Sequence, residues 1–80
     1  MNVGEAVSAR ILELCRERGI SVNKLSTISG VTQSTVNNIV SGRNNSTTVS
    51  TVKKLCDGLE ITLGEFFSTP EFNALEQEIK

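Results

Sequence analysis

The residues best suited to chemistry form one short polar run around positions 32–38, which reads TQSTVNN. Its side chains are amides and hydroxyls, with no carboxylate among them. Glutamine and asparagine offer a donor and an acceptor together, which matches the edge of adenine in the DNA major groove. The alternative is an ordinary solvated helix face, but such faces usually favour Glu and Lys. The polar members are Thr32, Gln33, Ser34, Thr35, Asn37 and Asn38.

Two short helices are expected to position this run, one over residues 22–29 and one over 33–41. Gly30 lies between them, where a helix must stop and a positive φ is easiest for glycine. Ser21 and Thr32 are suitable N-caps, and Gly42 can end the second helix. The apolar positions expected to pack one helix across the other are Leu25, Ile28, Val31, Val36 and Ile39.

The rest of the chain also has helical periodicity, and no stretch alternates long enough to predict a strand. Helices are expected over about 4–18, from 48 or 49 to 59, and over 63–67. Pro70 after Ser68-Thr69 indicates one more helix start, with a hydroxyl cap and proline in the first turn. This tail helix would place Phe72, Leu75 and Ile79 on one face. The prediction is therefore an all-α fold.

The ordered set from Leu25 through Gly30-Val31-Thr32-Gln33 to Gly42 resembles the helix-turn-helix domains of the phage-repressor/Cro type. Val52, Leu55, Leu59, Ile61 and Leu63 extend this resemblance, which runs over about residues 7–67. It implies a compact five-helix domain over residues 1–67. Residues 68–80 would be a short sixth helix that packs on the core or at a dimer interface.

The resemblance also implies how double-stranded DNA would be bound. The helix over 33–41 would enter the major groove, with Gln33 reading bases first, then Ser34 and Asn38, and with Thr32, Thr35 and Asn37 alongside. Phosphate contacts would come from the first turn of the preceding helix and from the loop after the reading helix. These phosphate-binding candidates are Lys24, Arg43, Asn44, Asn45, Ser46 and Thr47.

Three departures from the family pattern are visible. Val22 stands where the family often has a glutamine that supports a phosphate contact. Cys15 and Val40 stand where the family often pairs an arginine with a glutamate. Because both members of that pair are apolar here, no buried charge is left alone. Glu60 occupies a turn where the family usually has glycine.

The formal net charge is −1, but the charges are segregated along the chain. Every charged residue from Arg18 through Cys56 is basic, whereas the segment from Asp57 onward has six acids and only Lys80 as a base. A binding face is local, so the net charge does not exclude a polyanion as partner. Chance segregation of surface charges is the alternative explanation.

Several classes of function are disfavoured by composition. Eighty residues suit one domain and leave no room for a separate catalytic domain. There is no histidine, no glycine-rich phosphate loop and no paired carboxylate in a predicted cleft, so neither an enzyme, a metal site, a cofactor nor a small-molecule substrate is expected. Cys15 and Cys56 fit core positions as reduced thiols. Without a signal-like segment or an apolar run of about 20 residues, a cytoplasmic protein without membrane contact is expected.

The leading hypothesis is a sequence-specific DNA-binding transcriptional regulator of the repressor type. A homodimer through the C-terminal region is expected, since all three phenylalanines lie there, although the same residues could simply close the monomer core. The alternative is a protein-interaction adaptor or antirepressor that keeps the fold without specific DNA binding. Val22, the acidic C-terminal segment and the near-neutral net charge favour that alternative.

Overall fold

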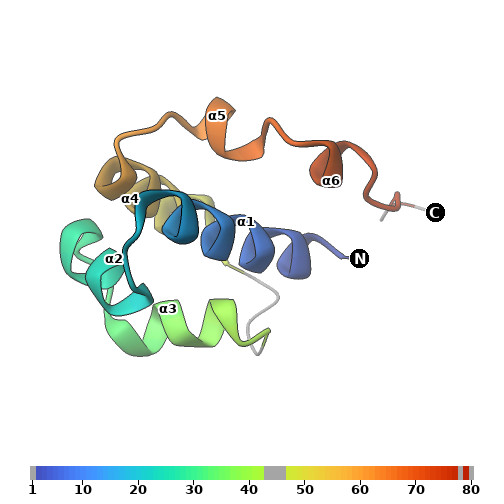
Figure 1. The fold of residues 1–80 in the computed structure, drawn as a ribbon. Helices are drawn as coiled ribbons and strands as arrows, with labels where there is room; N and C mark the ends of the chain where they lie inside the picture. Colours follow the sequence, from blue (N-terminus) through green and yellow to red (C-terminus); the bar gives the residue numbers. More distant parts are fainter. Residues whose placement is uncertain (1, 43–46, 78, 80) are drawn as a thin grey trace.

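Six helices follow one another in a computed structural model that describes residues 2–42, 47–77 and 79. The helices are α1 (Val3–Arg18), α2 (Val22–Ser29), α3 (Gln33–Val40), α4 (Val49–Leu59), α5 (Leu63–Phe67) and α6 (Pro70–Asn73). Figure 1 shows α1 in the middle, α3 along one edge, and α5 and α6 along the opposite edge. The described residues contain no strand, which confirms the all-α prediction. None of these helices is long and apolar enough to span a bilayer.

Side-chain caps begin the first five helices. Ser21 and Thr32 accept the backbone N–H of Lys24 and Thr35, as the sequence predicts. Asn2 caps α1 one residue earlier than expected, and the Glu5 carboxylate returns a hydrogen bond to the Asn2 N–H. Each cap satisfies one of the N–H groups that a helix start leaves without a partner. Local sequence therefore fixes where these helices begin.

The core lies between α1 and the crossing of α2 with α4. Its fully buried side chains are Ile11, Leu25, Val36, Ile39, Leu55, Cys56 and Phe66. Gly58 allows α2 and α4 to approach closely, because a Cβ there would lie 2.9 Å from the Cα of Ser29. Ile28, which was expected to face inward, is 40% exposed on the far side of α2. That expectation was wrong, since Leu25 and Ser26 are the buried residues of α2.

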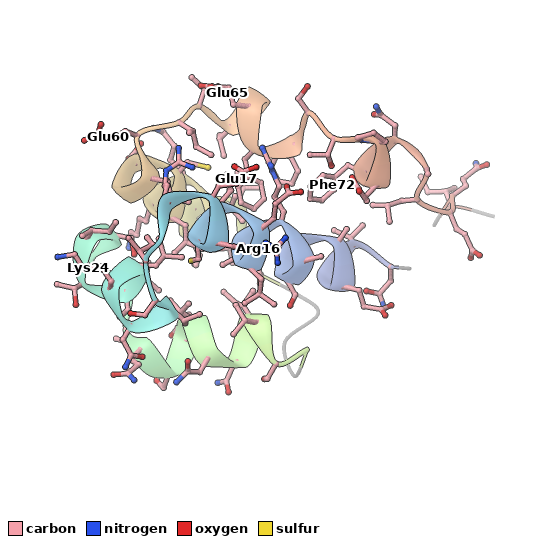
Figure 2. All side chains as sticks on the ribbon, viewed as in Figure 1. Arg16, Glu17, Lys24, Glu60, Glu65 and Phe72 are labelled. Atoms are coloured by element: carbon pink, nitrogen blue, oxygen red, sulfur yellow. The ribbon has the colours of Figure 1, made fainter. Side chains whose placement is uncertain are left out.

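The C-terminal region closes over α1 through its aromatic residues. Phe66 and Phe67 have ring centroids 4.9 Å apart in an edge-to-face arrangement, and Phe67 and Phe72 are also 4.9 Å apart. Arg10 of α1 ties α5 down, because its guanidinium donates to the carbonyls of Phe66 and Glu65 at 2.8 Å each. Figure 2 shows Phe72 between α6 and α1.

The tail helix is shorter than the sequence predicts. It ends at Asn73, so Leu75 lies past it and Ile79 is 81% exposed beyond it. The Thr69 side chain makes no cap hydrogen bond, contrary to the expected hydroxyl cap. In Figure 1 the chain after α6 runs past the amino end of α1, where no described helix covers it. A short helix without packing is marginal in water, which accounts for the early end.

Candidate nucleic-acid interface

The turn between α2 and α3 is fixed by its backbone and by one buried hydroxyl. Gly30 has φ 71°, and its N–H donates to the carbonyl of Ser26. The Ser26 hydroxyl, which is itself buried, donates to the carbonyl of Val31 at 2.5 Å. A residue with a Cβ would be strained at this φ. The turn therefore sets the direction in which α3 leaves α2.

One face of α3 is buried and the other is exposed. Val36 and Ile39 are 0% and 1% exposed, and they pack α3 onto the core. In Figure 1, α1 and α2 lie on one side of α3 and none of the described helices lies on the other. A helix of about 10–12 Å diameter fits a major groove about 12 Å wide. The exposed residues on and before α3 include Thr32, Gln33, Ser34, Asn37 and Asn38.

The hydroxyls at the start of α3 bond to one another. The Thr32 Oγ1 accepts the backbone N–H of Thr35 at 3.3 Å and donates to the Thr35 Oγ1 at 2.7 Å. It also lies 3.5 Å from the Ser34 Oγ. Thr35 is half-buried, unlike the other five candidates for base reading. Thr32 therefore serves mainly as the N-cap of α3. The more accessible groups are the Ser34 hydroxyl and the amides of Gln33, Asn37 and Asn38.

Gln33 is held by a residue that sequence reasoning missed. The Gln33 Nε2 donates to the Oδ1 of Asn23 on α2 at 2.6 Å. This bond uses one of two amide donors and orients the side chain, while the Gln33 Oε1 remains an acceptor. A donor and an acceptor on one amide are what bidentate adenine recognition requires. The bond to Asn23 therefore orients the Gln33 amide and leaves one donor and one acceptor for a further partner.

Asn23 is separated from Gln33 by the whole interhelical turn, so helical spacing alone could not link them. A signal was available, because Asn23 directly follows Val22, where the resemblance pointed to a missing glutamine. The structure places Val22 half-buried against the core. The amide is therefore present in the first turn of α2, one position later than expected.

The phosphate-binding candidates are only partly within the described residues. Lys24 is exposed on the first turn of α2, and Figure 2 shows it pointing away from the core. Thr47 is half-buried just before the Thr48 cap of α4. Lys53 pairs with Asp57 one turn along α4 and so is partly neutralised. Four candidates lie outside the described residues: Arg43, Asn44, Asn45 and Ser46.

Two acidic residues, Glu60 and Glu65, lie far from α3. Figure 2 shows Glu60 and Glu65 on the edge opposite α3, and residues 21–42 contain no Asp or Glu. The hydrogen bond from the Thr62 backbone is the largest effect that lowers the pKa of Glu65. The hydrogen bond with the Thr62 side chain and, to a smaller extent, the Arg18 charge lower the pKa further. This carboxylate therefore stays ionised at neutral pH, but on the far side of the molecule. A polyanion can approach α3 without meeting like charge from its own residues.

At its carboxyl end, α3 packs against α1 without an ion pair. Cys15 is 4% exposed, and burial raises the pKa of its thiol against the smaller opposite effect of the Arg18 charge. Val40 is half-buried beside the core. The two helices are nevertheless joined by a directional contact, because the Ser8 hydroxyl of α1 donates to the Val40 carbonyl at 2.9 Å.

Comparison with models of protein families matches residues 10–71 to the Cro/C1-type HTH DNA-binding domain. Among solved structures, the chain is similar to protein 11 of prophage Lp1, with 36% sequence identity and a TM-score of 0.81. The match covers 94% of this chain and 100% of that one. No curated protein matches the sequence.

Proposed function

Because this chain belongs to the family of Cro/C1-type helix-turn-helix DNA-binding domains, we propose that it is a repressor-like transcriptional regulator that recognises a specific DNA sequence. The observation that supports this proposal is the exposed amide and hydroxyl face of α3, which no carboxylate interrupts. That face offers donors and acceptors of the kinds that base edges accept in the major groove. The protein would act in the cytoplasm by occupying an operator.

In the proposed complex, α3 lies in the major groove and its first turn reads bases. Gln33, oriented by Asn23, pairs with adenine through one donor and one acceptor. Ser34, Asn37 and Asn38 extend the contact along the exposed face. We expect half-buried Thr35 to contact a thymine methyl group or a phosphate rather than a full base edge.

Phosphate contacts would fix the register of the domain without specifying sequence. The described candidates for these contacts are Lys24, exposed on the first turn of α2, and Thr47, half-buried just before the cap of α4. The contribution of residues 43–46 stays a prediction from the sequence. Each contact should release condensed cations, so affinity should fall as salt rises.

The proposed regulator binds as a homodimer, because one small module makes few base contacts. A twofold dimer would set its two copies of α3 in successive major grooves, about 34–36 Å apart. The phenylalanines pack on one another within the monomer. A C-terminal dimer surface would therefore rely on other apolar groups, such as half-buried Leu75 and exposed Ile79.

Selection of bound sequences from a random duplex pool tests the proposal directly. We expect a preferred duplex at about 50–100 mM salt, palindromic if the dimer forms, and a log–log salt slope near −0.9 per phosphate contact. Gln33→Ala should weaken binding to that duplex by about 5- to 150-fold, the equivalent of about 1–3 kcal/mol for one bidentate contact. Fluorescence anisotropy titrations measure the salt slope and the change in affinity.

Gln77→Ala is the matched control, because Gln77 is an exposed glutamine in the C-terminal tail. It should bind the selected duplex as the wild type does. A chain that selects no duplex, or a Gln33→Ala variant that keeps full affinity and preference, would contradict reading by α3.

The adaptor alternative is favoured by the acidic edge that carries Glu60 and Glu65 and by the net charge of −1. It predicts no preferred duplex and a regulatory phenotype that survives the combined Gln33→Ala and Asn38→Ala changes. The regulator hypothesis predicts that the same double variant folds normally but loses operator binding. One pair of substitutions therefore separates the two functions.

A further inference from the structure

The Ser8 hydroxyl joins two helices that are far apart in sequence. It lies half-buried on α1 and donates to the Val40 carbonyl at 2.9 Å, across 32 residues. A serine within a helix commonly returns its hydroxyl to a carbonyl of the same helix. Thr27 and Ser29 do so on α2, where they donate to the carbonyls of Asn23 and Leu25. Ser8 is different, because its bond leaves the helix.

The carbonyl that accepts this bond is one that α3 cannot satisfy itself. Val40 is the last residue of α3, and the last four carbonyls of a helix have no partner within it. Elsewhere α1 and α3 meet through apolar groups such as Val36 and Ile39, whose packing has no directional preference. The Ser8 hydrogen bond is therefore suited to fix how the end of α3 is oriented.

The opposite end of α3 is already fixed. The buried Ser26 hydroxyl holds the Val31 carbonyl just before the helix, and Thr32 caps its first turn. A helix of eight residues is about 12 Å long, so a tilt of about 10° around this start would move the far end by about 2 Å. Hydrogen bonds to base edges do not tolerate such a displacement.

We propose that Ser8 is a positioning residue for DNA recognition, which anchors the carboxyl end of α3 to α1. The proposal rests on the proposed function above. It implies that loss of the hydroxyl harms contacts made by Asn37 and Asn38, in the second half of α3, more than contacts made by Gln33 at its start. Ser8 itself touches no DNA.

The test compares three variants of the full chain with the wild type on the selected duplex. Ser8→Ala should weaken binding about 3- to 10-fold, the effect of one net hydrogen bond. Ser8→Thr keeps a hydroxyl and should bind within about twofold of the wild type. Ser29→Ala is the matched control, since this half-buried serine bonds only within α2. All measurements are made where thermal unfolding shows each variant to be folded.

A change in base preference separates positioning from simple destabilisation. Partial unfolding would scale the affinity for every duplex equally, and Ala also improves helix propensity on α1. Positioning predicts that Ser8→Ala loses preference at the base pairs whose recognition depends on Asn38, as mapped by the Asn38→Ala variant. It predicts retained preference at the pair mapped by Gln33→Ala.

Amide hydrogen exchange gives a readout that needs no DNA. The N–H groups of Ser41 and Gly42 bond to the carbonyls of Asn37 and Ile39 at the end of α3, and they should exchange faster in Ser8→Ala than in Ser29→Ala. A wild type that selects no duplex overturns the proposed function and the positioning role with it. If the wild type does select a duplex, then equal affinity and preference in Ser8→Ala overturn the positioning role alone, and so does a failure of Ser8→Thr to restore them.

Discussion

At Glu60 the backbone has φ 59°, a left-handed conformation that is unfavourable for a residue with a Cβ. The conformation is needed because it ends α4 with two hydrogen bonds. The Glu60 N–H donates to the Asp57 carbonyl at 3.2 Å, and the Ile61 N–H donates to the Cys56 carbonyl at 3.0 Å. The Glu60 side chain is exposed, so it gains little from the position.

Glu60→Gly is therefore expected to stabilise the fold. The left-handed conformation costs about 1–2 kcal/mol for a residue with a side chain, and Glu60→Gly removes this cost. Glycine also increases the conformational entropy of the unfolded chain, which offsets part of the gain in stability. We expect a net gain of up to about 1 kcal/mol, or a rise of several degrees in the midpoint of thermal unfolding. Gly30→Ala, which imposes the same strain at φ 71°, should lower that midpoint. A Glu60→Gly variant less stable than the wild type would contradict the strain argument.

The burial and exposure of side chains were predicted better than their hydrogen-bond partners. The exposed face of α3 followed from the positions of Val36 and Ile39, since a buried pair fixes which residues of a helix face outward. The Asn23–Gln33 bond and the Ser8 bond to Val40 did not follow, because both depend on the angle at which helices cross. That angle is set by packing throughout the core and is not encoded in any local spacing.

At the scale of elements, the crossing of α2 and α4 depends on Gly58. The helix continues through Gly58 to Leu59, the end that the sequence predicts. A Cβ at Gly58 would lie 2.9 Å from both the Cα and the Cβ of Ser29. Because backbone atoms are among these neighbours, the contact could be relieved only by moving one helix away from the other.

Gly58→Ala should consequently destabilise the fold, although alanine is the better helix former. The propensity gain is about 1 kcal/mol, while overpacking costs typically about 1–3 kcal/mol, so a net loss of about 1 kcal/mol is expected. Gly64→Ala in α5 is the matched control, since a Cβ there meets only the Thr62 Oγ1 at 3.7 Å. Urea unfolding of both variants measures the difference. Equal stabilities of the two would show that the crossing can adjust without cost.

Helix starts were predicted better than helix ends. Ser21 and Thr32 cap α2 and α3 as expected, because a cap is a local interaction between neighbouring residues. The predicted length of the tail helix was wrong because Phe72, Leu75 and Ile79 have helical spacing but do not pack on one common surface. Periodicity predicts a face, and only the rest of the fold decides whether something packs against it.

At the scale of the whole molecule, opposite edges differ in their charge. The uncharged face of α3 forms one edge, and the edge formed by α5 and α6 carries acids and closes the core (Figure 2). The net charge of −1 averages over these two edges and so describes neither. This separation keeps the carboxylates of the α5–α6 edge away from the exposed face of α3.

The same separation predicts how the C-terminal region contributes. Phe72 is half-buried against Phe66 and Phe67, with ring centroids 6.1 Å and 4.9 Å away. Phe72→Ala should therefore lower the free energy of unfolding by about 1–3 kcal/mol, less than the loss of a fully buried phenylalanine. Because α6 lies across the molecule from α3, the folded variant should keep the wild-type affinity for a single half-site.

Concentration dependence distinguishes closure of the monomer from a role in the dimer. If Phe72 only closes the core, thermal unfolding of Phe72→Ala should occur at a lower midpoint that varies with protein concentration as the wild-type midpoint does. If Phe72 also holds two copies together, the variant should lose that concentration dependence and its preference for a palindromic operator over a half-site. We expect the first result, because the aromatic partners of Phe72 lie within its own chain.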